Sequence, residues 1–190
     1  MNAASVVGIL LAAGRGERFG GDKLLSRLPD GECIGAASAR RLLAAVPHVV
    51  AVVRPDDAAL AAALGANGAR IVRCARAAEG LGASLACGVQ AGRDAAGWVV
   101  ALADMPWIES TTIARVADAL ANGAGIAAPF HHGERGHPVG FGRAFYEALA
   151  ALGGDEGAKT ILAAHRDRVT RIEVDDPGIL RDIDTRADLG

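Results

Sequence analysis

The sequence has few aromatic residues and no long apolar run, and each scarcity excludes a class of protein. Phe, Trp and Tyr make up 4% of the 190 residues, which favours close packing of Ala- and Gly-rich helices over a large aromatic pocket. Gly, Asp, Asn or Arg interrupts every apolar stretch before it reaches the roughly 18 residues that a transmembrane helix needs. We therefore expect a soluble protein with no membrane partner.

Cysteine is also scarce. Cys33, Cys74 and Cys87 are odd in number and include no Cys-x-x-Cys pair, a pattern that indicates neither a disulfide framework nor a zinc site. We expect all three to be reduced. The segment Met1–Ser5 has no basic region followed by an apolar stretch and a cleavage site, so the expected location is the cytoplasm.

An excess of charge of one sign is missing as well. The formal net charge is −2, and no basic stripe alternates with aromatic residues, so we expect no nucleic-acid partner. A small molecule is the expected ligand.

Short β-branched runs alternate with Ala- and Leu-rich stretches along the whole chain. Predicted strands cover 6–12, 48–53, 69–74, 98–102, 126–129 and 169–174, and predicted helices cover 36–45, 57–64, 83–91, 110–121, 143–152 and 158–165. This alternation predicts an α/β fold, a three-layer α/β/α Rossmann-like architecture with a mostly parallel sheet. Pro138–Phe141 predicts an extra, antiparallel strand and hence a mixed sheet. A chain of this length fits a single domain, 1–190.

A glycine-rich loop, LLAAGRGERFGGDKLL, runs from Leu10 to Leu25. Its glycines let backbone N–H groups approach anionic oxygens, and its cations can neutralise phosphate charge. The loop fits neither common phosphate motif, since a dinucleotide fingerprint needs Gly where Phe19 stands and a Walker A loop needs Lys where Asp22 stands. The structural alternative is a glycine-rich turn with solvated cations.

Asp104 follows the predicted strand 98–102, at the carboxyl end where α/β sheets bind ligands. Mg²⁺ commonly binds one or two carboxylates together with substrate oxygens, so Asp104 is a candidate metal ligand. The alternative is that Asp104 only organises the turn before Pro106.

Residues 11–23 spell LAAGxGxRxGxxK, which resembles the signature of the nucleotidyltransferases related to molybdenum-cofactor cytidylyltransferase and guanylyltransferase. The resemblance implies a nucleotide-diphospho-sugar transferase fold in which this loop wraps a nucleoside triphosphate. It assigns nucleotide binding to Leu11, Ala12, Ala13, Gly14, Gly16, Arg18 and Lys23. Lys23 and Arg18 become the catalytic candidates, with Lys23 stabilising charge on the α-phosphate and the leaving pyrophosphate.

The resemblance also covers two acidic elements. Asp104 lies in an ADMP element that implies contact with the nucleotide and with Mg²⁺. The tail DIDTRADL, residues 182–189, resembles a closing DIDTPEDL element and implies Asp184 as the second metal ligand, with Asp182 in reserve. Alternatively, Asp184 caps a short final helix.

Three further segments resemble the same family. GLGAS, residues 80–84, implies nucleotide contacts from Gly82 and Ser84, although Ser84 could equally be a helix N-cap. RGHPVGF and GDEGAK resemble the acceptor side and imply His137 and Lys159 as acceptor-binding residues. His137 could instead pack locally. Lys159 and Asp155 could contact the acceptor or belong to a solvated helix start, and for Asp155 we favour the solvated helix start.

Together these features predict a Mg²⁺-dependent enzyme that transfers CMP from CTP to a phosphorylated acceptor, for which the resemblance favours molybdenum-molybdopterin. CTP is preferred because the loop has Ala-Ala-Gly rather than the Ala-Gly-Gly of the guanylyltransferases. A molybdoenzyme or its chaperone would be the protein partner. The alternatives are molybdopterin guanylyltransferase, methylerythritol-phosphate cytidylyltransferase, a sugar-phosphate nucleotidyltransferase and, from another class, a non-catalytic nucleotide-binding regulatory or chaperone-like module.

Overall fold

A central sheet organises the structure, a computed structural model that describes residues 5–14, 16 and 19–189. The eight-stranded sheet has the order β3-β2-β1-β4-β7-β5-β6, and β8 also pairs with β5. The strands are β1 (Val6–Leu11), β2 (Val49–Val53), β3 (Arg70–Arg73), β4 (Gly97–Leu102), β5 (Ile126–His131), β6 (Glu134–Arg135), β7 (Val139–Gly142) and β8 (Val169–Glu173). β1, β2, β3 and β4 pair in parallel, as do β5 and β8, whereas β7 is antiparallel to both of its neighbours. The predicted mixed sheet with an antiparallel strand is confirmed.

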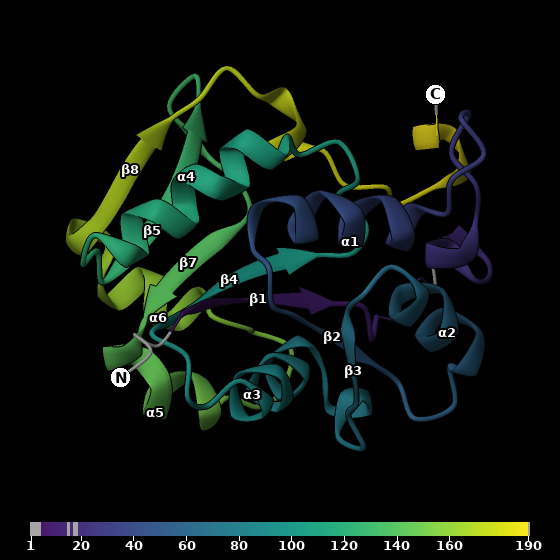
Figure 1. The fold of residues 1–190 in the computed structure, drawn as a ribbon, viewed down its shortest axis with the longest axis horizontal. Coiled ribbons are helices and arrows are strands. Elements are labelled where there is room, and N and C mark those ends of the chain that lie inside the picture. Colours follow the sequence, from purple (N-terminus) through teal and green to yellow (C-terminus); the bar gives the residue numbers. More distant parts are fainter. Residues whose placement is uncertain (1–4, 15, 17–18, 190) are drawn as a thin grey trace.

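Helices cover both faces of this sheet (Figure 1). They are α1 (Ile34–Ala45), α2 (Ala58–Ala66), α3 (Leu81–Ala91), α4 (Ser110–Ala121), α5 (Tyr146–Ala150) and α6 (Lys159–Ala164). Among residues 5–14, 16 and 19–189, no helix is both long enough and apolar enough to cross a membrane. Because helices cover both faces of a central sheet, the three-layer α/β/α prediction is confirmed.

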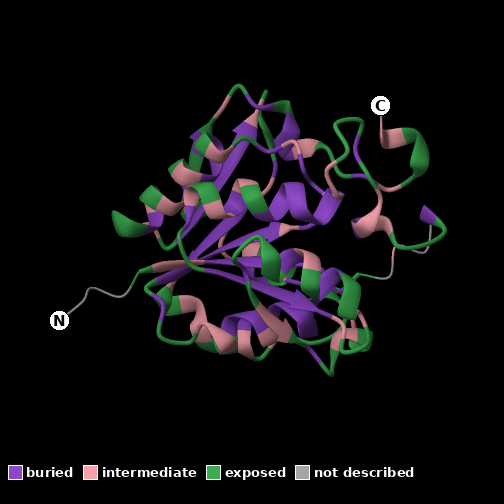
Figure 2. Cartoon of the chain, turned by 45° about the vertical axis from the view of Figure 1, so that its right-hand side comes forward, coloured by how far each residue is buried: buried purple, intermediate pink, exposed green. Residues whose placement is uncertain are grey.

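The core consists of two apolar layers, one on each face of the sheet. Side chains alternate across a strand, so successive residues of β1 belong to different layers. Ile9 packs in the layer beneath α3, α5 and α6, and Leu10 packs in the layer beneath α1, α2 and α4. Val49–Val53 is buried along its whole length, as expected for a parallel strand covered on both faces. Figure 2 shows this buried sheet between partly exposed helices.

Helix α3 begins two residues earlier than predicted. It also contains one cysteine of a disulfide, which contradicts the expectation for the cysteines. Cys74, just after β3, forms a disulfide with Cys87 of α3, with 6.0 Å between the Cα atoms, while Cys33 is free. The prediction of three reduced cysteines was therefore wrong. Pairing requires proximity in space, and the docking of α3 against the sheet supplies a proximity that sequence spacing does not report.

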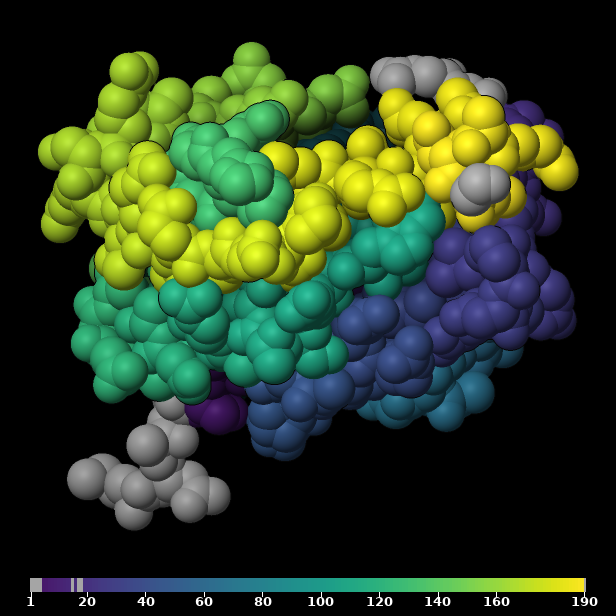
Figure 3. All heavy atoms as spheres, turned by 90° about the horizontal axis from the view of Figure 1, so that it is seen from above, coloured from purple at the N-terminus to yellow at the C-terminus, as the bar shows by residue number. Residues whose placement is uncertain are grey.

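The chain after β8 returns across the molecule to the glycine-rich loop. In Figure 3 the yellow C-terminal residues cross one face and reach the purple N-terminal part. Asp176, 2% exposed, anchors this return by accepting hydrogen bonds from the Thr112 hydroxyl (2.7 Å) and the backbone N–H groups of Glu109 (2.9 Å) and Gly178 (3.0 Å). Further along, the N–H of Ile183 donates to the carbonyl of Asp104 (2.9 Å), so the tail lies directly beside the end of β4.

Candidate active site

A pocket of about 670 Å³ lies at the carboxyl ends of β1 and β4. Leu11 and Leu102, the last residues of these strands, form part of its wall, and the loop after β1 contributes Ala13, Gly14 and Gly16. Parallel strands end at the same edge of the sheet, so the loops that follow them meet there. The volume falls in the range of about 300–1,000 Å³ typical of small-molecule sites.

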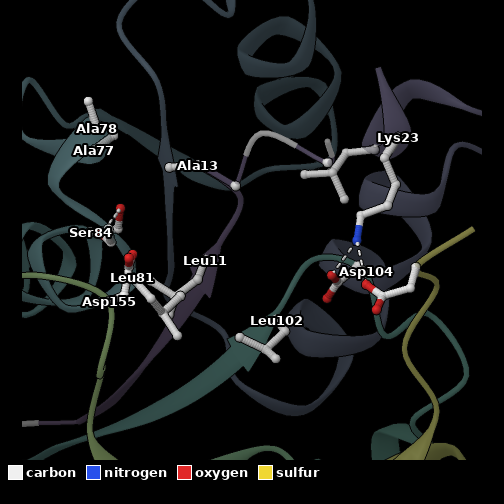
Figure 4. A pocket seen from close by; sticks show the side chains of 15 residues that line it. Leu11, Ala13, Lys23, Ala77, Ala78, Leu81, Ser84, Leu102, Asp104 and Asp155 are labelled. Carbon is white, nitrogen blue, oxygen red and sulfur yellow. Dashed lines mark hydrogen bonds and ion pairs between the residues drawn. The ribbon is translucent and has the colours of Figure 1, made fainter. Parts of the chain in front are cut away.

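One end of the pocket is charged. The Lys23 ammonium lies 2.7 Å from Asp104 Oδ2 and 3.8 Å from Asp184 Oδ1. The Lys23 side chain is only 11% exposed, against 24% for Asp104 and 45% for Asp184. Figure 4 shows the lysine pointing between two carboxylates, with ion pairs dashed. A cation held by two carboxylates in a largely water-free position interacts more strongly than an exposed pair.

Glycine is required at position 16 to place Lys23. Gly16 has φ +59°, in the left-handed region that other residues avoid, and a Cβ added there would stand 3.1 Å from the Lys23 Cβ. The backbone N–H of Lys23 donates to the carbonyl of Gly21 (2.7 Å), and Lys23 then begins a 3₁₀ turn that ends at Leu25. The glycines of this loop therefore give the lysine its position as well as leaving room for a ligand.

The opposite end of the pocket is mainly apolar and carries one carboxylate. Ala77, Ala78 and Leu81 line it together with Ser84 and Asp155, and Figure 4 shows this group across the pocket from Lys23. Leu81 is the one large apolar side chain classed as exposed within the described part of the chain, at 40%. An apolar wall next to a charged end suits an amphipathic ligand with an anionic tail.

Ser84 lies inside the first turns of α3 rather than at its N-cap. Its hydroxyl donates to the carbonyl of Gly80 (3.3 Å), and Gly80, with φ +124°, is the N-cap residue. A Cβ at Gly80 would collide with the Asp155 side chain and with the Gly154 carbonyl. Asp155 lines the pocket and is also exposed, so the preference for a solvated helix start left out its position beside the N-cap of α3. The GDEGAK resemblance was the signal that pointed to it.

The predicted nucleotide and metal positions fall into three groups. Eight of them line the one pocket, namely Leu11, Ala13, Gly14, Gly16, Lys23, Ser84, Asp104 and Asp184. Ala12 and Gly82 stand behind the wall: Ala12 packs into the core at 2% exposed, and the N–H of Gly82 is already bonded to the carbonyl of Gly154 (2.8 Å). Arg18 lies outside the described residues.

The two predicted acceptor residues lie outside the pocket lining. His137 lies two residues before β7, and its ring atom Nδ1 is buried without a hydrogen-bond partner. Its backbone N–H donates to the carbonyl of Ile179 (3.0 Å). Burial, followed by the charge of Arg135, lowers the pKa of His137 to about 4, so the imidazole is neutral near pH 7. Lys159, exposed at the start of α6, also contributes to this lowering, and Asp182 opposes it.

Asp188 holds the backbone of the second carboxylate segment, a role that the sequence analysis missed. Its Oδ2 atom accepts from the N–H groups of Asp184 (3.1 Å) and Thr185 (2.6 Å) and from the Thr185 hydroxyl (2.9 Å). These bonds, above all that from the Thr185 N–H, lower the pKa of Asp188. Asp188 therefore bonds back to the backbone at the start of the final turn, four residues after Asp184 in DIDTRADL.

The carboxylates Asp104 and Asp184 converge on one cation from separate segments, and one or two carboxylates are the protein ligands that Mg²⁺ commonly uses. Within the described ranges, no group of three or more His, Cys, Asp or Glu residues is placed to hold a metal. Any divalent ion here would therefore complete its coordination with substrate oxygens and water, as Mg²⁺ usually does.

Comparisons with known proteins show which proteins the chain is similar to. A family model described as the MobA-like NTP transferase domain matches residues 8–169. Purine catabolism protein PucB of Bacillus subtilis (strain 168) is 31% identical over 203 residues, covering 97% of this chain and 94% of that protein. Nicotine blue oxidoreductase of Paenarthrobacter nicotinovorans is 29% identical over 188 residues, covering 95% and 92%. The crystal structure of Rv0371c from Mycobacterium tuberculosis H37Rv superposes with a TM-score of 0.84 at 28% identity, covering 98% of this chain and 96% of that one.

Proposed function

Because the chain belongs to the MobA-like NTP transferase family and is a nucleotidyltransferase, we propose that it transfers CMP from CTP to a phosphorylated acceptor, with Mg²⁺ as its cofactor. The observation that carries the proposal is the meeting of Lys23, Asp104 and Asp184 at one end of the glycine-lined pocket. A cation and two carboxylates suit the triphosphate and its metal, and the apolar end suits a nucleoside.

The direction of the nucleotide follows from the distribution of charge. The triphosphate would lie over Gly14 and Gly16 towards Lys23, where backbone N–H groups and an ammonium stabilise anionic oxygens. The nucleoside would then point to Ala77, Ala78 and Leu81, with Ser84 and Asp155 as its polar neighbours. We favour CTP over GTP because residues 12–14 read Ala-Ala-Gly rather than the Ala-Gly-Gly of the guanylyltransferases.

The reaction would be an in-line displacement at the α-phosphorus. An acceptor phosphate oxygen forms the new P–O bond, the bond from the α-phosphorus to the bridging oxygen breaks, and pyrophosphate leaves with the bonding pair. Lys23 stabilises the charge that develops on the α-phosphate and on the leaving group. Asp104 and Asp184 would hold Mg²⁺, which supplies further neutralisation of phosphate charge when bound. No covalent intermediate with the protein is required.

The acceptor would approach from the side of His137 and Lys159. These residues share an electrostatic environment with Asp182, which precedes Asp184 by two positions. Lys159 could pair with an acceptor phosphate, whereas the Nδ1 atom of His137, buried and without a partner, would have to become accessible before it could contact the acceptor. The resemblance of RGHPVGF and GDEGAK supports molybdenum-molybdopterin as the acceptor, with delivery to a molybdoenzyme or its chaperone.

A turnover assay with each of the four nucleoside triphosphates, Mg²⁺ and a panel of phosphorylated acceptors tests the proposal. We expect pyrophosphate release with CTP and molybdenum-molybdopterin, and a loss of at least about 100-fold in Lys23→Met, as for other groups that stabilise transition-state charge. Exclusive use of GTP would reject the CTP assignment. Turnover with methylerythritol phosphate would move the chain to that acceptor, and nucleotide binding without turnover on any acceptor would support the non-catalytic module.

The matched control for Lys23→Met is Lys159→Met, which removes the same charge outside the pocket lining. Under the proposal it should raise the KM for the acceptor and leave the affinity for CTP within about twofold, since an exposed charge outside the pocket lining contributes little. An equal loss of CTP affinity in both variants would mean that net charge, rather than the position of Lys23, governs binding.

A further inference from the structure

The ammonium of Lys23 stands where a metal ion bound by Asp104 and Asp184 would need space. Its Nζ atom is 2.7 Å from Asp104 Oδ2 and 3.8 Å from Asp184 Oδ1. A Mg²⁺ ion binds carboxylate oxygen at about 2.1 Å, so an ion on the same Asp104 oxygen would lie less than about 5 Å from the ammonium. Two cations at that separation, with the lysine 11% exposed, repel each other strongly.

We propose that Lys23 is an internal counterion that keeps divalent metal out of the free protein, so that the metal enters together with the nucleotide. The inference rests on the proposed function, because that function places the metal on Asp104 and Asp184. Without nucleotide, the ammonium already neutralises part of the charge of the two carboxylates, and a metal would have to displace it or bind beside it.

The nucleotide removes this obstacle by giving Lys23 a second anionic partner. The pocket that contains Lys23 continues to Gly14 and Gly16, where the phosphates are proposed to lie. Once the ammonium contacts a phosphate oxygen, Asp104 and Asp184 become available to the metal that accompanies the triphosphate. Lys23 would therefore act twice, first as a barrier to metal alone and then as a partner of the phosphates.

Titration of the free protein with Mn²⁺, followed by calorimetry and by electron paramagnetic resonance, tests this inference without any turnover. Compared with wild type, Lys23→Met should bind Mn²⁺ about tenfold more tightly or better, because one repelling charge less than about 5 Å from the ion is removed. Lys23→Gln should behave in the same way. Lys159→Met removes an identical charge elsewhere and should bind Mn²⁺ as the wild type does, within about twofold.

A second substitution locates the effect. In the Lys23→Met background, Asp104→Asn should abolish the tighter binding, because it removes one of the two carboxylates that the ammonium had covered. Thermal melts provide an independent readout, in which Mn²⁺ should raise the Tm of Lys23→Met more than that of the wild type, since a ligand stabilises the state that binds it. The melts also report whether each variant is folded.

The outcomes separate this inference from the proposed function. If Lys23→Met and Lys23→Gln, both folded, bind Mn²⁺ no more tightly than the wild type, the counterion role is refuted even where CTP turnover is confirmed. Tighter binding that survives Asp104→Asn also refutes it, because the ion then sits elsewhere. Tighter binding that depends on Asp104, in a protein that turns over no acceptor, upholds the inference and rejects the proposed function.

Discussion

The anchor at Asp176 gives the sharpest test of how the tail is held against the active site. Its carboxylate is 2% exposed and accepts three hydrogen bonds, from Glu109 N–H, the Thr112 hydroxyl and Gly178 N–H. Asp176→Ala leaves these donors without a partner in a place that water reaches poorly. At about 1–3 kcal/mol for each buried unsatisfied donor, and with some relaxation of the tail, we expect a loss of about 3–5 kcal/mol.

Urea unfolding and thermal melts measure this loss. For a chain of 190 residues, each kcal/mol lowers the Tm by about 2–4 °C, so Asp176→Ala should lower it by about 6 °C or more. Asp176→Asn keeps one acceptor oxygen and should lose about half as much. The neighbouring Asp175 is exposed, and Asp175→Ala should stay within about 0.5 kcal/mol of the wild type. Equal melting temperatures for the two alanine variants would refute the anchor.

The remaining predictions concern the disulfide, the buried histidine and the glycine beneath the lysine. Cys87→Ser removes the disulfide to Cys74, which closes a loop of 13 residues, and should lower the free energy of unfolding by about 3 kcal/mol. When the protein is denatured without a reductant, the variant should also show one more reactive thiol than the wild type. His137 has a folded pKa of about 4, below its unfolded value, so its contribution to the free energy of unfolding is complete above about pH 6.5 and falls by about 3 kcal/mol as the pH approaches 4. In urea unfolding recorded across that range, His137→Gln should flatten this decline. A steeper decline in the variant would contradict the burial of a neutral ring. Gly16→Ala forces a side chain into φ +59° against Lys23, which should lower the free energy of unfolding by about 1–2 kcal/mol. It should also reduce kcat/KM for pyrophosphate release by a larger factor than that loss of stability explains. Unchanged kinetics would show that the position of the lysine does not depend on this glycine.

The elements of the fold were largely predictable because local residue patterns specify them. Val49–Val53 is a short apolar run that is buried along its whole length, and Val6–Leu11 is one that is buried from Gly8 onwards. Burial on both faces of the sheet is what favours continuous apolar residues in such strands. The start of α3 was less predictable. Leu81 and Gly82 begin the helix because the glycine at position 80 adopts a positive φ and the 153–155 loop packs against it. This loop is distant in the sequence, so no local pattern reports the contact.

The candidate site was predictable in its residue types and only partly in its arrangement. Lys23, Asp104 and Asp184 were selected from letters alone, and all three line one pocket. The bonds of Asp188 to the backbone of Asp184 were missed within the DIDTRADL element. The contact of Asp155 with the N-cap of α3 was missed because it joins segments far apart in the chain, although the GDEGAK resemblance pointed to this segment. The Cys74–Cys87 bridge was missed for the same reason.

Local residue patterns were enough to show that a glycine-rich, cationic loop follows a buried strand and that carboxylates follow two other segments, because turn formation and strand burial depend on nearby residues. Long-range contacts bring together the ammonium of residue 23 and the carboxylate of residue 104, which are 81 positions apart in the sequence and 2.7 Å apart in space. Parallel pairing of β1 with β4 brings their carboxyl ends to one edge, and the buried anchor of the tail brings Asp184 to the same place. These are long-range contacts whose energies come from packing and burial rather than from any local pattern.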